Sequence, residues 1–335
     1  MKLISYLNEK ELDQLAILVE NMAYDANTCD SNLPANMNDF LWEGDDAMEL
    51  AKECDKKIKS GKIARSQGKP IETLQLIAPV PFPTSTRDAY AFRQHVESAR
   101  KNRGLEMIPE FDQFPVFYFT NHNAIQGQGD VELMPDHFQQ LDFELEIAIV
   151  IGKEGRNIRA DEADDYIAGY MILNDLSARF LQMEEMKLNL GPAKGKDFVN
   201  LLGPWLITPD ELQKYLVKPK QGHVGNLYDL KMQCLVNGKL VSEGNTKDMD
   251  WTFAEIIERA SYGVDLLPGE VIGSGTVGTG CFLELNGTGK RKDPNYQPQW
   301  LQANDVVEME VEGLGKLVNT MKKANTDYSI LSMKK

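Results

Sequence analysis

The sequence predicts an α+β fold that is mainly β. Residues 141–152 alternate with period two between an apolar face and a face that begins with carboxylates, which is typical of a strand. Residues 229–244 predict a β-hairpin around Asn237 and Gly238. Residues 304–321 predict two further strands. Helical patterns are fewer, so strands should form most of the core.

The first 72 residues differ in pattern from the rest. Residues 8–26 place apolar side chains at helical spacing, and residues 45–61 repeat that pattern. We therefore expect a small helical N-terminal segment over residues 1–72 and a larger domain over residues 73–335. The apolar positions of the first stretch are Leu12, Leu15, Ile17, Leu18 and Met22.

The larger domain begins with strands and proline turns. Residues 74–88 predict a strand followed by a proline-punctuated loop, and residues 114–121 predict another strand. Residues 161–175 begin as a helix and end in an apolar run. Residues 249–263 predict an amphipathic helix, and residues 270–287 predict strands joined by glycine turns.

The composition limits the classes of partner. The chain has 335 residues, of which 42% are hydrophobic, and its net charge is −15. This acidity argues against nucleic acid and anionic membrane surfaces, because both attract basic proteins. No apolar stretch reaches the roughly 18 residues that a membrane-spanning helix needs. The N-terminus also lacks the apolar core of a signal peptide.

The cysteines indicate a reducing compartment. They are widely spaced and form neither a CxxC motif nor a Cys/His cluster in the sequence, which argues against zinc. We expect reduced, mostly buried thiols in a cytoplasmic protein. The four cysteines are Cys29, Cys54, Cys234 and Cys281.

Two carboxylates on the strand at 141–152 predict either a metal or an ion pair. Glu144 and Glu146 are two residues apart, so they project from the same face of a strand. Uncompensated burial of both would cost several kcal/mol or force protonation. A hard divalent cation would relieve the repulsion. Pairing with lysine or arginine would do so as well, and the spacing leaves both possibilities open.

A third carboxylate follows the apolar run of residues 167–173. Asp175 comes directly after this run, where a charged residue often belongs to a functional site. Arg179 and Gln182 follow at a spacing that shares one helical face. The alternative is an ordinary helix start with Asp175 or Ser177 as its cap.

Two glycine-rich stretches resemble phosphate- or nucleotide-binding motifs, but neither has all the features that those motifs require. Residues 190–206 contain Lys194 and Lys196 but not the order of a phosphate-binding loop, and a surface loop is the alternative. Residues 273–278 match GxGxxG, which requires a following helix. Residues 281–287 instead predict a strand, so we interpret the glycines as a turn beside a site.

Taken in order, these stretches resemble the fumarylacetoacetate hydrolase family over residues 75–320. The motifs are weak singly and specific as an ordered set. The resemblance implies a mixed β-sandwich roll built around a divalent cation (Mg²⁺, Ca²⁺ or Mn²⁺), with a homodimer as the default assembly. The motifs are RDAYAFRQH, FPVFY, DFELEIAIVIG, YMILNDLSARFLQ, LGPAKGKDF, GSGTVG and FLELNG.

The resemblance implies metal ligands and catalytic groups. His95 matches the family's general base, and Glu284 matches the glutamate that orients it. Arg179, Gln182 and Lys196 fall near the oxyanion that would develop on the substrate. The residues assigned to the metal are Asp88, Glu144, Glu146, Asp175, Lys196 and Asn200.

Substrate contacts are implied by the same motifs, with two departures. Met186 stands where fumarylacetoacetases have a tyrosine. Arg103 adjoins Gly104, which occupies the position of a family arginine. The substrate's far end should therefore differ from fumarylacetoacetate. The residues assigned to the substrate are Tyr90, Tyr118, Arg103, Gln182, Met186 and Thr276.

The activity that the resemblance implies is hydrolysis of a carbon–carbon bond. The substrate would be a small 1,3-diketo acid of the fumarylacetoacetate or acylpyruvate type, attacked by water that His95 activates. Decarboxylation, isomerisation or lyase chemistry on an oxo-acid is the alternative on the same scaffold. From another class, the chain could be a non-catalytic metal-binding relative whose N-terminal segment covers the pocket.

Overall fold

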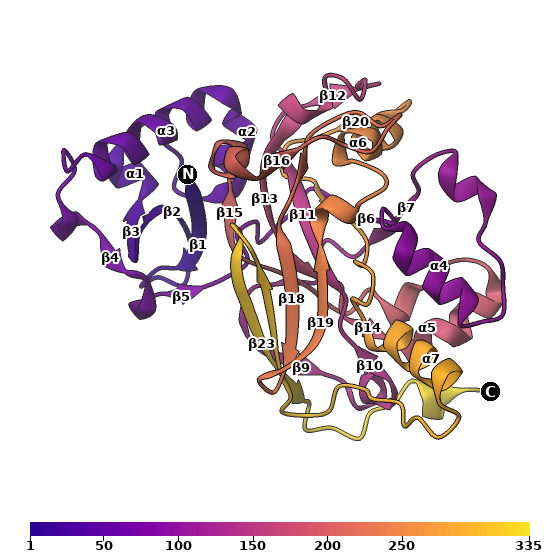
Figure 1. Cartoon of the computed structure of the whole chain (residues 1–335). Helices are drawn as coiled ribbons and strands as arrows, with labels where there is room; N and C mark the ends of the chain where they lie inside the picture. Colours follow the sequence, from indigo (N-terminus) through magenta and orange to yellow (C-terminus); the bar gives the residue numbers. More distant parts are fainter.

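Two large β-sheets organise the chain in the computed structural model, which describes residues 1–335 (Figure 1). The larger sheet runs through the whole molecule, and β5 (Gln75–Leu76) and β8 (Ile125–Gln126) add to it by pairing with β1 and β15. Its main path is β4 (Lys69–Pro70), β3 (Met22–Asp25), β2 (Asp13–Val19), β1 (Lys2–Leu7), β15 (Asn200–Ile207), β13 (Ile167–Asn174), β11 (Leu145–Ile151), β21 (Val271–Gly273), β6 (Thr86–Ala89) and β7 (Phe117–Thr120).

The smaller sheet packs against the middle of the larger one. Three two-stranded ribbons complete the β structure. The smaller sheet has the order β19 (Lys239–Asn245), β18 (Lys231–Val236), β22 (Val306–Val311), β23 (Gly315–Lys323) and β9 (Gly129–Leu133). The ribbons are β10 (Leu141–Asp142) with β14 (Ser177–Ala178), β12 (Gly155–Arg156) with β20 (Asp265–Leu266), and β16 (Leu216–Val217) with β17 (Leu227–Tyr228).

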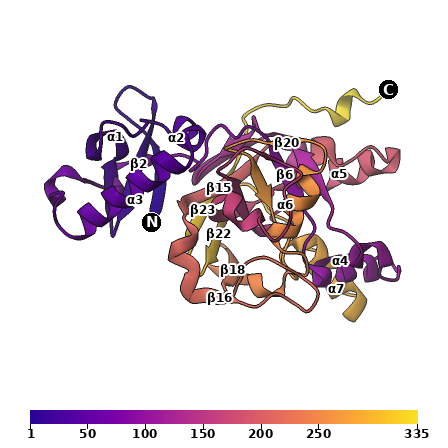
Figure 2. The same ribbon diagram turned by 90° about the horizontal axis from the view of Figure 1, so that it is seen from above.

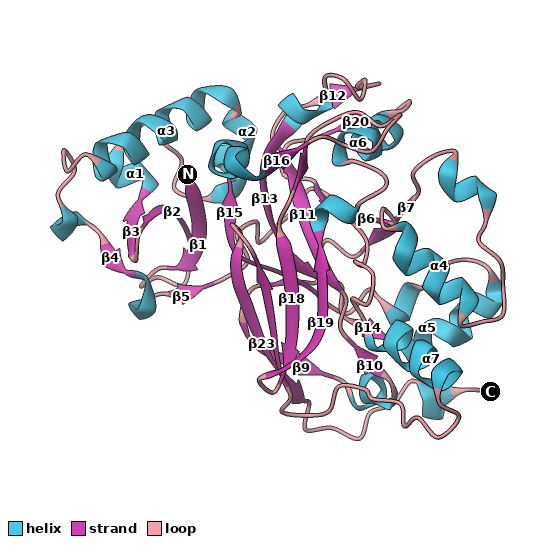
Figure 3. Cartoon of the chain, viewed as in Figure 1, coloured by secondary structure: helices cyan, strands magenta, loops and turns pink.

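Apart from α6, which lies near β20, the helices form two groups on opposite sides of the sheets (Figure 3). Three accompany the N-terminal strands, whereas α4, α5 and α7 gather on the other side, and the view from above shows the same separation (Figure 2). The first group is α1 (Ala26–Cys29), α2 (Met37–Glu43) and α3 (Asp45–Lys59). The others are α4 (Arg93–Lys101), α5 (Arg179–Glu185), α6 (Phe253–Ser261) and α7 (Phe282–Lys292).

The two faces of β11 belong to different cores. Ile147 and Ile149 pack into a cluster that includes residues of the smaller sheet, such as Met309. On the opposite face, Ala148 and Val150 pack into a second cluster that includes α2, α3 and the N-terminal strands. Apolar burial on both faces stabilises the centre of the larger sheet.

The prediction of a helix over residues 8–26 is wrong. This stretch forms β2 and β3, and the sheet continues from β2 through β1 to β15. Leu15 and Ile17 face one core, while Ala16 and Leu18 face another. A strand buried on both faces shows no polar alternation, so its apolar run also fits helical periodicity. The helix predicted over residues 45–61 is confirmed as α3.

The prediction of a strand over residues 281–287 is also wrong, because α7 begins there. Alternating burial at Phe282, Glu284 and Asn286 imitates the period of a strand. The Asp142 carboxylate accepts hydrogen bonds from the backbone N–H groups of Phe282 and Leu283, at 2.7 and 2.9 Å. A distant residue therefore caps this helix, and the local sequence does not reveal it.

Three smaller predictions have mixed outcomes. Residues 161–166 hold only a short 3₁₀ turn, Ala163–Tyr166, before β13 begins. The strand predicted over residues 141–152 is interrupted, since β10 ends at Asp142 and β11 begins at Leu145. The hairpin at Asn237 and Gly238, the two late strands and helix α6 are confirmed. No helix has the length and apolarity required to cross a membrane.

Candidate metal and catalytic centre

Four carboxylates meet at one end of the larger sheet. Asp88 comes from β6, Glu146 from β11, Glu144 from the break before β11, and Asp175 from the residue after β13. One oxygen of each lies within 4.8 Å of the others, and all four side chains are buried. The neighbouring strands therefore bring together the carboxylates that the sequence motifs single out.

Two cations compensate part of this charge. The Lys196 ammonium contacts Glu144 and lies 2.6 Å from Asp175 Oδ2. The Arg179 Nη2 lies 2.6 Å from Glu144 Oε1. Although burial acts in the opposite direction, Arg179 and Lys196 hold the pKa of Glu144 well below its usual range. Glu144 thus has both the cationic partners and the clustered carboxylate neighbours that the two alternatives require.

Asp88 and Glu146 have no cationic partner. Asp88 Oδ1 accepts a hydrogen bond from the Gly275 backbone N–H at 3.1 Å, and Glu146 Oε1 accepts one from the Thr276 hydroxyl at 3.2 Å. Burial and the Asp175 carboxylate raise the pKa of Asp88 to about 8. Burial and the neighbouring carboxylates of Asp88 and Glu144 raise the pKa of Glu146 well above its usual range.

The unsatisfied atoms of the centre fit a hard cation. Glu146 Oε2 and Asp175 Oδ1 are buried and have no hydrogen-bond partner. An all-oxygen donor set with excess negative charge is what Mg²⁺, Ca²⁺ and Mn²⁺ prefer. Lys196 does not itself fit as a ligand, because the two carboxylates keep its pKa raised despite burial, and an ammonium has no lone pair. It instead compensates charge.

A histidine and a glutamate pair beside the carboxylates. His95 on α4 and Glu284 on α7 approach to 2.6 Å between Nδ1 and Oε2. The Glu284 carboxylate also accepts a hydrogen bond from the Thr279 N–H at 3.0 Å. This pairing holds the proton on Nδ1 and leaves Nε2 free to accept one. The Tyr90 ring stands edge-on to the imidazole, with centroids 5.8 Å apart.

Asp142, to which no sequence motif assigns a role, contacts both Arg179 and the start of α7. Its Oδ2 accepts a hydrogen bond from Arg179 Nε at 2.8 Å, while the same carboxylate caps α7, which carries Glu284. Arg179 Nη1 in turn donates to Gln182 Oε1 at 3.0 Å, which leaves the Gln182 amide nitrogen available as a donor. Asp142 is fully buried. Through these contacts it positions Arg179 on one side of the centre and the start of α7, which carries Glu284, on the other.

The remaining predicted residues divide into two groups. The Tyr118 hydroxyl donates to Asp175 Oδ2 at 2.5 Å, so this tyrosine joins the centre. Arg103 is exposed just after α4 and donates to the Ala99 carbonyl of that helix, and Met186 is exposed at the end of α5. Asn200 is buried at the start of β15 and hydrogen-bonds Thr120 and the Asn121 carbonyl instead of a carboxylate.

The GxGxxG stretch packs against Asp88 of the carboxylate cluster. It is followed by a helix, contrary to expectation, but Gly273 pairs with Asp88 in the sheet. A Cβ on Gly273 would lie 2.4 Å from Asp88 Oδ1, and Gly275 adopts a φ of +77° while its N–H bonds the same carboxylate. The glycines therefore make room for Asp88.

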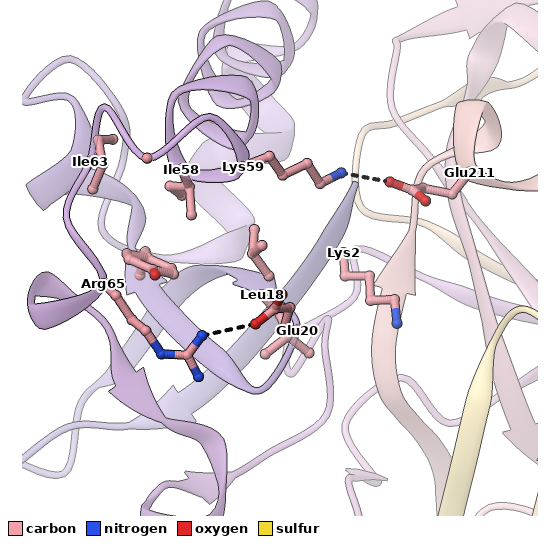
Figure 4. Close-up of a pocket in the computed structure, with 11 residues that line it drawn as sticks. Lys2, Leu18, Glu20, Ile58, Lys59, Ile63, Arg65 and Glu211 are labelled. Carbon is pink, nitrogen blue, oxygen red and sulfur yellow. Dashed lines mark hydrogen bonds and ion pairs between the residues drawn. The ribbon is translucent and has the colours of Figure 1, made fainter.

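A separate hollow of about 390 Å³ lies between the N-terminal strands, α3 and residue Glu211 (Figure 4). Most of its charged side chains are already paired. Lys59 lies 3.1 Å from Glu211, and Arg65 lies 2.8 Å from Glu20. We therefore place the chemistry at the buried carboxylates and not here.

Comparisons with known proteins agree with the architecture. Residues 84–322 match the family model described as "Fumarylacetoacetate (FAA) hydrolase C-terminal". The chain is 31% identical over 296 residues to the Xenopus laevis protein named oxaloacetate tautomerase fahd2, mitochondrial, which covers 88% of this chain and 81% of that one. It is 34% identical over 201 residues to the 2,4-didehydro-3-deoxy-L-rhamnonate hydrolase of Sphingomonas sp. (strain SKA58), covering 60% and 62% of the two chains.

A solved structure shows the same fold. Maleylpyruvate hydrolase from Sphingobium.sp SYK-6 superposes with a TM-score of 0.65 at 20% identity, over 97% of this chain and 100% of that chain. The family model spans well over half of the sequence, and it includes every carboxylate of the centre and both members of the His95–Glu284 pair. The chain therefore belongs to the fumarylacetoacetate hydrolase family, a family of enzymes.

Proposed function

We propose that the protein is a metal-dependent hydrolase that cleaves a carbon–carbon bond in a small 1,3-diketo acid. The observation that carries this proposal is the His95–Glu284 pair beside four buried carboxylates. Water attack on a carbonyl needs a base that is held in one tautomer, and this pair supplies one. A site that only bound metal would not need an oriented imidazole.

The cation would be held by the carboxylate cluster. Bound there, it would polarise the substrate carbonyls and stabilise negative charge on their oxygens. The net charge of the cluster supports this assignment, because Lys196 and Arg179 contact only Glu144 and Asp175 among the four carboxylates. The ligands would be Asp88, Glu144, Glu146 and Asp175.

His95 would act first as a base and then as an acid. Nε2 accepts a proton from water, and the hydroxide adds to one carbonyl carbon of the substrate. When the bond from that carbonyl carbon to the central carbon of the diketone breaks, its electron pair goes to the central carbon. The imidazolium returns the proton there, so that the water supplies OH to one product and H to the other. Glu284 stabilises the intermediate imidazolium.

The chain's neutral donors would orient the substrate. Gln182 has a free amide nitrogen because Arg179 holds its carbonyl oxygen. Such an amide, fixed in advance, can bond an oxygen that gains charge during the reaction. Lys196 donates to carboxylates, and Arg179 donates to carboxylates and to the Gln182 carbonyl oxygen, so their contribution to the oxyanion is mainly long-range charge.

Tautomerisation of an oxo-acid is the second candidate. The Xenopus laevis relative is named an oxaloacetate tautomerase, and it aligns over more of this chain than the hydrolase relative does. A tautomerase would use the same imidazole to move a proton between carbon and the enol oxygen. No water would be consumed.

Oxygen-18 water separates the two candidates. The purified protein with Mg²⁺ or Mn²⁺ is incubated with an acylpyruvate, fumarylacetoacetate or oxaloacetate, and diketone absorbance is followed. A hydrolase places one heavy oxygen in the new carboxylate, beyond exchange in an enzyme-free control. Keto–enol interconversion of oxaloacetate without cleavage of any diketo acid would establish the tautomerase instead. Turnover of none of them would favour a non-catalytic relative.

A further inference from the structure

A second group of possible metal ligands lies beside the carboxylate cluster. It consists of His95 on α4, Glu144 before β11, and Cys281 at the residue before α7. One ligand atom of each lies within 4.8 Å of the others, and all three side chains are buried. The sequence gives no hint of this group, because its members are separated by 49 residues or more.

The chemistry of this group differs from that of the carboxylates. Sulfur, imidazole nitrogen and a carboxylate oxygen together suit Zn²⁺, whereas an all-oxygen set suits Mg²⁺ or Ca²⁺. Three protein ligands with an open fourth position are typical of accessible zinc sites. Cysteine spacing along the chain does not reveal this group, because the fold brings together a Cys/His cluster that the sequence lacks.

Each of the three groups has capacity for an ion. Cys281 Sγ makes only a weak contact, accepting from the Glu284 N–H at 3.5 Å. His95 bonds Glu284 through Nδ1, which leaves Nε2. A carboxylate behind a ligating histidine is the usual arrangement at zinc sites, where it fixes the imidazole. The Glu144 oxygens each contact one cation and retain a further lone pair.

We propose that His95, Glu144 and Cys281 form a second, thiolate-containing site for Zn²⁺ that inhibits the enzyme. Binding replaces the thiol proton: the S–H bond breaks, an S–Zn bond forms, and one proton leaves to the solvent. The imidazole donates its lone pair to the ion. His95 can then no longer accept a proton from water. This inhibitory consequence rests on the proposed function, whereas the binding itself does not.

Cobalt reports directly on such a site. The full-length reduced protein, saturated with Mg²⁺, is titrated with Co²⁺ and its near-ultraviolet absorbance is recorded. We expect a thiolate-to-cobalt charge-transfer band that Zn²⁺ abolishes, with release of one proton per ion in calorimetry. Co²⁺ on the carboxylate cluster gives no such band, because that cluster has no sulfur.

Two serine variants assign the band. Cys281→Ser keeps an acceptor for the Glu284 N–H and should lose the band, with zinc affinity weakened more than about tenfold. Cys54→Ser changes another buried thiol, on α3, and should keep both the cobalt band and the zinc affinity. A band that survives in Cys281→Ser, or its absence from the unaltered protein, would overturn the proposal. Recording the spectrum of the unaltered protein does not depend on whether any variant folds.

Activity measurements test the consequence separately. For any substrate that is turned over, zinc should inhibit the unaltered protein, and the half-inhibitory concentration should rise more than about tenfold in Cys281→Ser relative to its own zinc-free rate. Equal zinc sensitivity of the two would overturn the inhibitory role. A cobalt band in a protein that turns over no substrate would support the metal site while contradicting the proposed function.

Discussion

The face that β11 shares with the preceding Glu144 passes from buried charge to apolar packing. At its beginning, Glu144 and Glu146 meet the other carboxylates of the centre. Two residues further on, Ala148 and Val150 pack into the core shared with α2 and α3. The alternation of the strand is the same in both halves, so the difference comes from what covers each half.

The covering elements explain the division. The N-terminal strands and helices close over the second half with apolar side chains, whereas α4, α5 and α7 bring His95, Arg179 and Glu284 to the side of the centre (Figure 1). One end of the sheet thus holds buried charge at the expense of stability, and the other end supplies apolar burial. Substitutions at the two ends should therefore separate function from stability.

The largest effect is expected at His95. In His95→Ala, turnover should fall by about 10²–10⁴-fold, because proton transfer to and from the water is lost. Cation affinity, measured by calorimetry with Mn²⁺, should remain, since the four carboxylates are unchanged. His122→Ala, at an exposed histidine, is the control and should behave like the unaltered protein. Unchanged turnover in His95→Ala would remove this residue from catalysis.

Glu146→Gln should weaken cation binding without destabilising the chain. The ligand charge disappears, so affinity should fall by more than about tenfold. Without a cation, the free energy of unfolding should stay the same or rise, because a neutral amide avoids the desolvation and proton uptake that burial imposes on the Glu146 carboxylate. Calorimetry and urea unfolding in chelator measure the two quantities, and Glu132→Gln on the exposed side of β9 is the control. Unaltered Mn²⁺ affinity would exclude Glu146 as a ligand.

The apolar end should respond in the opposite way. Leu206 on β15 is fully buried in the core shared with the N-terminal region. Leu206→Ala should lower the free energy of unfolding by about 2–5 kcal/mol through lost burial and a residual cavity. Mn²⁺ affinity of the folded protein should not change, whereas the exposed control Leu216→Ala should affect neither quantity. A coupled loss of Mn²⁺ affinity would show that the two ends act as one unit.

The smallest effect concerns a histidine outside the centre. Burial, followed by the nearby Lys194, lowers the pKa of His137 from 6.5 to about 4, and the ring stacks on Phe198. The folded chain therefore binds this proton less readily than the unfolded chain does. Stability from the neutral ring is present above pH 6.5 and is lost as the pH falls towards 4.

In His137→Phe, the pH-dependent stability that comes from the neutral imidazole should disappear. The free energy of unfolding, measured between neutral and mildly acidic pH, should fall less steeply with acidity than in the unaltered protein. Turnover at neutral pH should persist. An identical pH dependence in the two proteins would mean that His137 titrates normally.

The local sequence predicts the structure correctly where one face of a strand is polar. It also does so where the residues of a turn or helix cap themselves favour the observed conformation. The hairpin at Asn237 and Gly238 follows from two residues that accept positive φ, which are +52° and +74° here. Helix α6 follows from its own capping box at Thr252 and Glu255. The ordered motifs also brought the four carboxylates and the His95–Glu284 pair together correctly.

Local sequence failed where a distant partner decides the structure. β2 is buried on both faces by elements that lie far away in the chain, so its apolar run carries no strand signature. α7 begins where the Asp142 carboxylate, about 140 residues earlier, caps it. In both cases the energy that selects the structure comes from contacts that no local window contains.

The sequence by itself, through its ordered motifs, identified the family and grouped the four carboxylates with the His95–Glu284 pair, because those residue types recur in the family's motifs in a fixed order. The tertiary structure decided which carboxylates are neutralised by Lys196 and Arg179 and which are not. It also placed the Cys281 thiol beside His95, although the two are far apart along the chain. Charge compensation and ligand geometry depend on distances of a few ångströms, and only the packed fold sets those distances.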